Sequence, residues 1–169
     1  EPEEMLRVIF DYAAKIANER LLDRVLMLMA DMGREMIVSD RCTVWLLDTQ
    51  KNELWSKVAH GLDEIRIPST AGLVGYAVTN DQAVFIHDAY TNEEYKSYLQ
   101  NGALRTDQQT GYRTKALMVI PFRNSQGEIM GAYQAINKLT ASEQFSDKDM
   151  EYLTLASSYA GKSLESALL

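Results

Sequence analysis

Helix-period patterns occupy both ends of this chain, and the section between them is a series of short β-branched and aromatic runs separated by turns. Apolar residues recur every three or four positions over about 3–18 and again over 20–38, which predicts two amphipathic helices. A third helix is expected from Ser146, where Ser-x-x-Asp ending at Asp149 predicts a capping box. The predicted apolar stripes are Leu6, Ile9, Phe10, Ala13 and Ile16, then Leu22, Val25, Leu26, Met29, Met32 and Met36, and last Leu153, Ala156, Ala160, Leu164 and Leu168.

The middle section predicts a sheet whose strands are mostly joined by short turns. The expected strands are 42–47, 54–60, 65–67, 84–86, 116–122 and 129–137, with short helical segments at 72–80 and 93–99. Hairpin connections make neighbouring strands antiparallel, and long amphipathic helices must bury their stripes against one sheet face. We therefore expect an α+β fold, with a six-stranded antiparallel sheet that carries the terminal helices on one face.

Length, charge and cysteine content narrow the class of protein. The 169 residues are enough for one domain with its own core, which we expect to span 1–169 with a terminal helix over 1–18. The net charge of −7 argues against a nucleic-acid partner. No apolar run reaches membrane-spanning length, and the single cysteine, Cys42, suits a reducing, cytoplasmic compartment. Because the sequence begins at Glu1, we expect it to be a piece of a longer chain.

Residues for catalysis are scarce. The two histidines, His60 and His87, are scattered, and neither has a further ligand at metal-site or triad spacing. The only thiol, Cys42, stands at the start of a predicted strand, where a small buried side chain is its ordinary role. We expect a non-enzymatic protein without a metal site or a bound cofactor.

Asn137-Lys138 closes the last predicted strand, and Phe145 and Asp149 follow around the start of the last helix. This arrangement resembles the N-K-x(n)-F-x-x-x-D-E signature of GAF domains, in particular those of cyclic-nucleotide phosphodiesterases and GAF-containing adenylyl cyclases. The resemblance covers about 20–165 and includes, in order, 41–48, 65–68, 71–76, Asp88-Ala89-Tyr90, Thr110-Gly111-Tyr112-Arg113-Thr114 and 119–122. It implies a GAF-like sheet, with small helices and loops from 65–114 covering a ligand pocket on the face opposite the long helices.

The resemblance also implies which residues would bind a cyclic nucleotide. The positions of Leu73 and Val74 offer backbone contacts to the cyclic phosphate, and a helix start with glycines at 72 and 75 is chemically suited to an anion. The remaining positions that match ligand-binding residues of the family are Thr43, Asp107, Thr110, Thr114 and Gln134.

Three departures separate this chain from that pattern. Ala59 and His60 stand where the family has an aromatic and an acidic residue that hold the purine, which weakens the expected binding. The residue covering the base is left open among Tyr95, Lys96 and Tyr98, and Met150 replaces the last glutamate of the signature. Without a carboxylate acceptor for guanine, the site favours adenine slightly.

Two functions remain open at this stage. One is a sensory module that binds a small molecule, cAMP or cGMP in the first place, and controls an output domain in the same parent chain. The other is a module that dimerises and relays a signal with no ligand or with a different one. For either function we expect a homodimer through the terminal helices. We interpret Lys138 and Asp149 as a structural pair that holds the last helix on the sheet.

Overall fold

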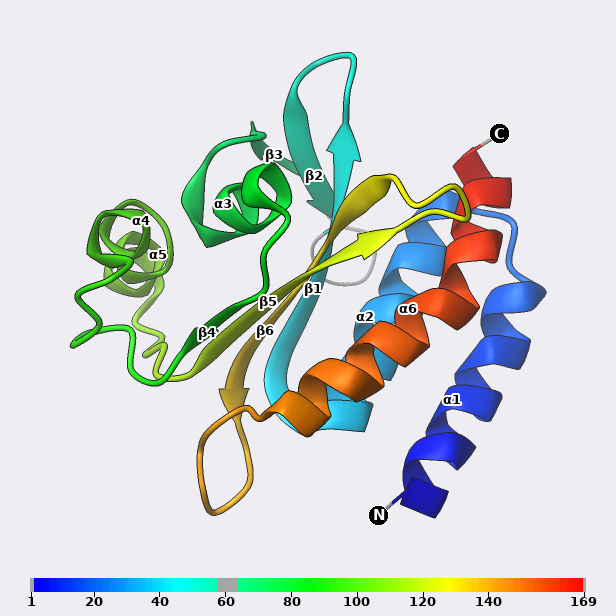
Figure 1. Ribbon diagram of the computed structural model, residues 1–169, viewed down its shortest axis with the longest axis horizontal. Coiled ribbons are helices and arrows are strands. Elements are labelled where there is room, and N and C mark those ends of the chain that lie inside the picture. The colour runs from blue at the N-terminus through cyan, green and yellow to red at the C-terminus, as the bar shows by residue number, and fades with distance from the viewer. Residues whose placement is uncertain (1, 58–63, 169) are drawn as a thin grey trace.

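The computed structural model describes residues 2–57 and 64–168, and Figure 1 shows their arrangement. The helices are α1 (Pro2–Ala17), α2 (Leu22–Ile37), α3 (Gly72–Asn80), α4 (Lys96–Asn101), α5 (Ala103–Thr110) and α6 (Asp147–Leu168). The strands are β1 (Ser39–Asp48), β2 (Glu53–Lys57), β3 (Glu64–Pro68), β4 (Val84–Ile86), β5 (Leu117–Arg123) and β6 (Ile129–Lys138).

The six strands form one sheet in the order β3-β2-β1-β6-β5-β4, and every neighbouring pair is antiparallel. The chain thus has the expected α+β fold with a six-stranded antiparallel sheet. The two long strands, β1 and β6, lie side by side at its centre, where Thr43 is paired with Gln134 and Trp45 with Ala132. Segments from opposite ends of the chain therefore meet in the middle of the sheet.

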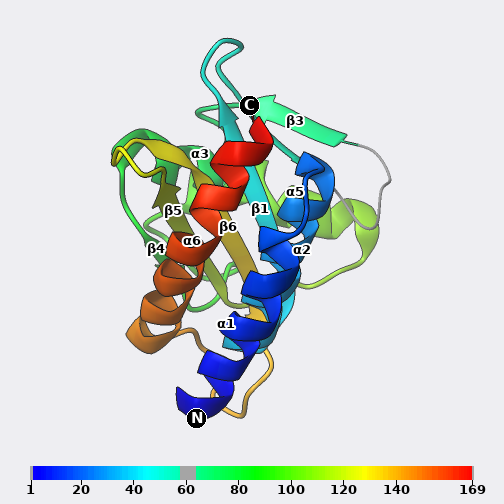
Figure 2. The ribbon, with the colours of Figure 1, turned by 90° about the vertical axis from the view of Figure 1, so that its right-hand side faces the viewer.

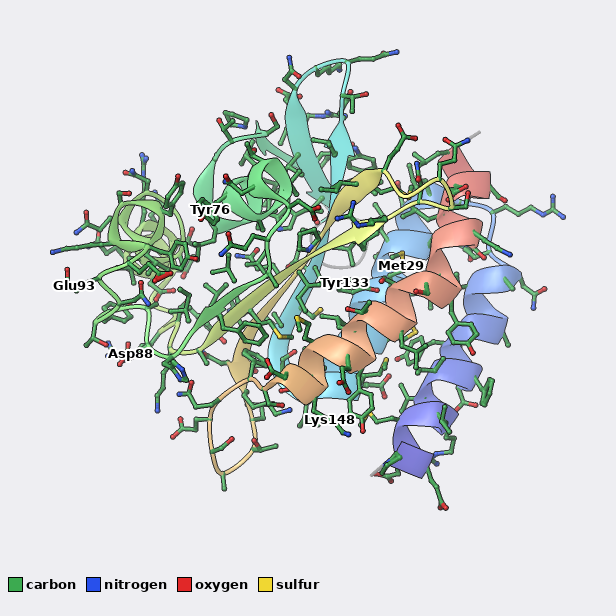
Figure 3. The ribbon with its side chains drawn as sticks, in the orientation of Figure 1. Met29, Tyr76, Asp88, Glu93, Tyr133 and Lys148 are labelled. Carbon is green, nitrogen blue, oxygen red and sulfur yellow. The ribbon has the colours of Figure 1, made fainter. Side chains whose placement is uncertain are left out.

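The long helices cover one face of the sheet, called the helical face below. Helices α2 and α6 pack on the strands, and α1 lies outside them against both (Figures 1 and 2). The core under α2 and α6 includes Met29, Tyr133 and Leu153, all fully buried. Tyr133 projects from the sheet toward α2 (Figure 3), where its hydroxyl donates to the backbone oxygen of Met29 at 3.4 Å.

The opposite face, called the lid face, is covered by α3, α4 and α5, which together form the lid. Helix α3 packs directly on β5 and β6, and α4 packs on α3 (Figure 1). The core beneath includes Trp45, Leu73, Leu99 and Val119. Strands β3 and β4 belong to the edges of the sheet, so the covering segments of 65–114 are the three short helices and their loops.

Several expectations about the helices need correction. The structure adds helix α5, whose sequence Ala-Leu-Arg-Thr-Asp-Gln-Gln-Thr has too few apolar residues to give a clear helical period. The stripes of the terminal helices are only partly buried. Ile9 and Ile16 are in the core, whereas Leu6, Phe10 and Leu168 are 47%, 60% and 49% exposed. Because α1 packs on two helices rather than on the sheet, fewer of its apolar side chains are buried than the sequence pattern predicts.

The predicted capping box is present: the Asp149 carboxylate accepts from the Ser146 backbone N–H at 2.9 Å, and the Ser146 hydroxyl accepts from the Asp149 N–H at 3.4 Å.

Residues 58–60 of the expected second strand lie outside the described residues. Across the described parts of the chain, no helix combines the length and the apolar character needed to cross a bilayer.

Candidate functional site

The register of β1 and β6 places two polar side chains next to each other in the middle of the lid face. Thr43 on β1 is paired with Gln134 on β6, and Gln134 is in turn paired with Val119 on β5. Trp45, two residues along β1, donates its indole Nε1–H to Gln134 Oε1 at 3.0 Å. Among the described residues, neither the Thr43 hydroxyl nor Gln134 Nε2 has a hydrogen-bond partner, and both side chains are half-buried. The face therefore presents one unused hydroxyl and one unused amide N–H₂.

Helix α3 begins on the same side of the sheet. Leu73 and Val74 bury their side chains in the lid core, while the N–H groups of a first helical turn have no partners within the helix. Gly75 lets the preceding loop pass close by, because a Cβ there would overlap the backbone of Thr70 and would lie 2.9 Å from the Ser69 oxygen. The loop and the helix start are thus held tightly together.

Asp107 on α5 and Thr114 beyond it are brought together, but they bind each other. Asp107 is 5% exposed and accepts from the Thr114 N–H at 2.7 Å, from the Thr114 hydroxyl at 2.9 Å and from the Tyr90 hydroxyl at 2.7 Å. This contact raises the pKa of the Tyr90 phenol. Both residues expected to contact a ligand therefore organise the lid. Tyr90 belongs to a motif of the sequence pattern, but the sequence does not indicate its hydrogen bond to Asp107, because Asp107 lies seventeen positions away on another element.

Thr110 lies away from this cluster. Its hydroxyl donates to the Thr106 oxygen one turn back at 2.9 Å, on the exposed end of α5. The segment that follows, residues 112–116, is called the strap. In the strap, the Tyr112 hydroxyl donates to the Asp40 carboxylate, and the Arg41 guanidinium lies 3.5 Å from the centre of the Tyr112 ring. Burial and the contact with Asp40 raise the pKa of the Tyr112 phenol to about 12.

The three residues left open for covering a base differ in burial. Tyr95 is 8% exposed, Tyr98 is half-buried and Lys96 is exposed. Tyr76 on α3 meets both tyrosine rings edge-on, with centroids 5.2 Å apart (Tyr76 is labelled in Figure 3). Burial is the main cause that raises the pKa of Tyr95 to about 12. The aromatic group thus packs the lid onto its own core. Ala59 and His60 lie outside the described residues.

The signature residues lie at the end of the sheet. Lys138 Nζ is 2.8 Å from Asp149 Oδ1 and 2.6 Å from the Ile37 oxygen at the end of α2. Phe145 is buried in the core of the helical face. The expected contact between strand end and helix start is therefore present.

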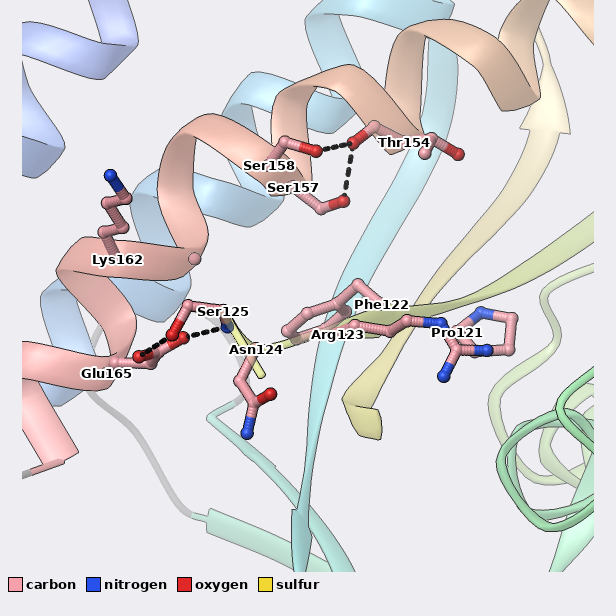
Figure 4. A pocket seen from close by; sticks show the side chains of 11 residues that line it. Pro121, Phe122, Arg123, Asn124, Ser125, Thr154, Ser157, Ser158, Lys162 and Glu165 are labelled. Carbon is pink, nitrogen blue, oxygen red and sulfur yellow. Dashed lines mark hydrogen bonds between the residues drawn. The ribbon is translucent and has the colours of Figure 1, made fainter. Parts of the chain in front are cut away.

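Three hollows on the surface of the described residues lie elsewhere. One, of about 330 Å³, lies between the β5–β6 hairpin and α6 (Figure 4), where the Ser125 N–H and hydroxyl bind the Glu165 carboxylate. The second adjoins His87 and Gln144, and the third lies where the α1–α2 connection meets the end of α6. None of these three is lined by a residue expected to bind the ligand. Within the described residues, no three His, Cys, Asp or Glu side chains gather as a metal site.

Comparison with known proteins gives concordant results. The family model described as GAF domain matches residues 21–164. A curated relative, the dual 3',5'-cyclic-AMP and -GMP phosphodiesterase 11A of Takifugu rubripes, is 31% identical over 147 residues, which are 79% of this chain and 16% of that protein. The chain thus spans about a sixth of the length of this relative.

Solved structures share the fold at low identity. The GAF domain of an Acinetobacter phosphoenolpyruvate-protein phosphotransferase superposes with a TM-score of 0.74 at 17% identity, covering 96% of this chain and 93% of that one. The free methionine-R-sulfoxide reductase of Neisseria meningitidis, solved with its substrate, gives 0.72 at 20% identity, covering 97% and 90%. One fold therefore serves proteins with different tasks.

Proposed function

This chain belongs to the GAF domain family, and we propose that it is a small-molecule-binding regulatory module whose ligand is a cyclic nucleotide. The observation that carries the proposal is the pair of unused polar groups on the lid face, the Thr43 hydroxyl and Gln134 Nε2. Half-buried polar groups without protein partners are ready for a ligand or for water. The similarity to a dual 3',5'-cyclic-AMP and -GMP phosphodiesterase supports a cyclic nucleotide as the ligand class.

The site offers complementary chemistry for each part of a cyclic nucleotide. The N–H groups at Gly72, Leu73 and Val74 suit the phosphate, because the start of a helix carries partial positive charge. Gln134 suits adenine: Nε2 donates to a ring nitrogen, and Oε1, which has a second lone pair besides the one used by Trp45, accepts from the N6 amine. Thr43 adds a hydroxyl beside it.

Ligand binding is coupled to the lid in this proposal. Trp45, Leu73 and Tyr95 belong to one buried cluster between the sheet and the lid, and Trp45 is hydrogen-bonded to Gln134. A ligand that displaces part of this packing has its binding energy coupled to the position of the lid. In the proposed function, this displacement is the signal passed to an output domain of the parent chain.

The position of the thiol also supports a non-enzymatic role. Cys42, the only thiol of the chain, lies on the helical face, where a Cβ added to Gly33 of α2 would be 3.1 Å from its sulfur. Burial raises the pKa of this thiol to about 12, which keeps it protonated near neutral pH. Cysteine chemistry is therefore remote from the proposed ligand site.

Calorimetry with cAMP, cGMP, AMP and GMP tests the proposal. Wild type is expected to bind cAMP with micromolar affinity. Thr43→Val replaces threonine with a side chain of nearly the same shape that lacks the hydroxyl, and the loss of one hydrogen bond is expected to weaken cAMP affinity about five- to tenfold. Thr49→Val, at an exposed turn position, is the matched control and should bind as wild type does. Gln134→Glu, which supplies an acceptor for guanine's donors, should shift preference toward cGMP.

Wild-type protein, confirmed free of ligand, that gives no heat with any of the four nucleotides at hundreds of micromolar would reject cyclic-nucleotide binding. Binding that Thr43→Val and Thr49→Val leave equally unchanged would place the ligand somewhere other than on the lid face.

A second function, dimerisation through the terminal helices, is favoured by exposed apolar residues on α1 and α6. Helices α1 and α6 run in the same direction side by side (Figures 1 and 2), and both contribute to the hollow at their upper ends. Phe10 and Tyr159 remain 60% and 51% exposed, with Leu6 and Leu155 one turn before them. Exposed apolar residues on two helices that pack against each other are the basis of this second proposal.

Light scattering at micromolar concentration tests this function. Wild type is expected to be dimeric and Phe10→Gln/Tyr159→Gln monomeric, with Leu21→Gln, an exposed residue on the α1–α2 connection, as control. A monomeric wild type would reject dimerisation of this domain on its own.

A further inference from the structure

Asn137, the first residue of the family signature, has a side chain whose hydrogen-bonding capacity is fully used by the strap. Its Oδ1 accepts from the backbone N–H groups of Lys115 at 2.7 Å and Ala116 at 3.2 Å. Its Nδ2 donates to the Arg113 oxygen at 2.9 Å and to the Tyr112 hydroxyl at 3.0 Å. One primary amide offers two donors and two acceptor sites, so all four are engaged. The side chain extends the β5–β6 ladder beyond its last backbone pair.

The backbone of Asn137 is equally specific. Its φ of 60° lies in the left-handed region, which asparagine tolerates better than most residues. Side chains of a regular strand alternate between faces, so Lys138 would lie on the lid face, as Gln134 does. The left-handed residue breaks this alternation, and Lys138 reaches the helical face, where it meets Asp149 and the Ile37 oxygen. Consecutive residues thus hold opposite sides of the sheet.

The contacts of the strap continue into the lid. Thr114, in the middle of the strap, makes both of its hydrogen bonds to Asp107 of α5, and Asp107 also holds Tyr90. Arg113, next to it, stacks its guanidinium 4.2 Å from the centre of the Tyr90 ring. A shift of α5 therefore acts on the strap, and the strap is fixed to the sheet by the Asn137 amide.

We propose that Asn137 is a positioning residue for the ligand lid, and that Asn137-Lys138 couples the lid to the start of α6. The inference rests on the proposed function, since it assigns to the lid the ligand whose binding the coupling transmits. In this arrangement, movement of α5 reaches Lys138 through Thr114, the strap and Asn137. Lys138 then acts on the first turn of α6 and on the end of α2.

Amide hydrogen exchange followed by NMR on the ligand-free protein tests the positioning role independently of any ligand. Asn137→Gly keeps the left-handed backbone accessible and removes all four side-chain hydrogen bonds. The matched control is Asn52→Gly, because Asn52 is also an asparagine with φ of 53° but lies in the exposed β1–β2 turn. We expect Asn137→Gly to speed exchange at Thr114, Lys115, Ala116 and the α5 amides about tenfold, and Asn52→Gly to leave them unchanged.

Lys138→Met tests the coupling. Its lost contacts lie on the helical face, so a merely structural role would speed exchange only around residues 37–39 and 146–151. Coupling predicts that exchange also rises at the strap amides, by about threefold. Affinity for cAMP, measured in parallel by calorimetry, should fall at least about fivefold in Asn137→Gly and stay unchanged in Asn52→Gly.

Each arm can overturn its part of the proposal. Unchanged exchange at Thr114 and α5 in Asn137→Gly would refute the positioning role, and strap amides unaffected by Lys138→Met would refute the coupling. A wild type that binds no cyclic nucleotide would reject the proposed ligand alone, while the exchange measurements would still decide the role of Asn137.

Discussion

The ion pair between Lys138 and Asp149 is the contact whose removal tests most directly how α6 is held on the sheet. The two side chains are only 12% and 8% exposed, and their charged atoms are 2.8 Å apart. Lys138→Met and Asp149→Leu each remove one charge while keeping a side chain of similar size. Neither substitution opens a large cavity, so the measured change reports on the uncompensated partner and, for Asp149→Leu, also on the lost hydrogen bonds from Ser146.

The two substitutions should differ in magnitude. Asp149→Leu leaves a buried ammonium with one neutral acceptor, the Ile37 oxygen, and is expected to cost about 3–5 kcal/mol. Lys138→Met leaves a carboxylate that still accepts from the Ser146 N–H and lies in the first turn of α6, where the helix dipole favours negative charge. We therefore expect a smaller loss of about 2–3 kcal/mol. In the double variant, the loss should fall short of the sum by about 2 kcal/mol.

Urea unfolding at pH 7, followed by circular dichroism, gives the three free energies. The control is Glu4→Ala, which breaks the Arg7–Glu4 pair on α1, whose side chains are 69% and 64% exposed and whose charges are 3.6 Å apart. An exposed pair of this kind is worth less than about 1 kcal/mol. Losses below 1 kcal/mol that simply add in the double variant would refute the reasoning and show that water compensates the pair.

Three further outcomes follow from local features. Val38→Gly should stabilise the protein by about 1 kcal/mol in urea unfolding, because Val38 ends α2 with a φ of 53° that a β-branched residue adopts poorly; a destabilised variant would contradict this. Gly75→Ala should lower the thermal midpoint by several degrees and weaken cAMP binding, since its Cβ would displace the Thr70 backbone; an unchanged midpoint would show that the loop yields freely. Burial raises the pKa of the Cys42 thiol to about 12, so Cys42 should react with iodoacetamide at pH 8.5 at least about a hundredfold more slowly in the native state than in urea. The stability that this neutral thiol contributes should be lost as the pH rises from the ordinary pKa of a thiol toward 12. Equal reaction rates in the native and unfolded states would contradict this prediction.

Much of the fold could be predicted because its elements carry strong local signals. The segments 72–80 and 84–86 were expected at the bounds observed, and the antiparallel sheet followed from short turns such as 124–127. Helix α5 was missed because its eight residues bury little besides Asp107, so tertiary contacts rather than an apolar stripe hold it. The exposure of Phe10 was missed for a related reason: periodicity shows that a helix has an apolar side, but it does not show how much of that side is covered.

The candidate site was less predictable, because its chemistry depends on which polar groups find each other in three dimensions. Thr114 and Asp107 are seven positions apart and both suit a ligand, yet in the fold they satisfy one another. Gln134 and Trp45 are 89 positions apart, and their bond follows from the register of β1 and β6. The sequence therefore indicates where polar side chains occur, whereas the contacts in the fold determine which of them have no hydrogen-bond partner.

Most of the family signature lies on the helical face, whereas the proposed ligand site lies on the lid face, so the signature by itself does not indicate which ligand is bound. Lys138, Phe145 and Asp149 lie on the helical face and hold the start of α6 against the sheet. The polar groups of the proposed ligand site, at Thr43 and Gln134, come from the central strands, and part of the core on the same face comes from short helices without a strong period of their own. Changes in the lid can therefore alter the ligand while the signature keeps the scaffold. Asn137 is the exception, since its side chain fixes the strap while its backbone turns Lys138 toward α6, so substitutions there should affect both faces at once.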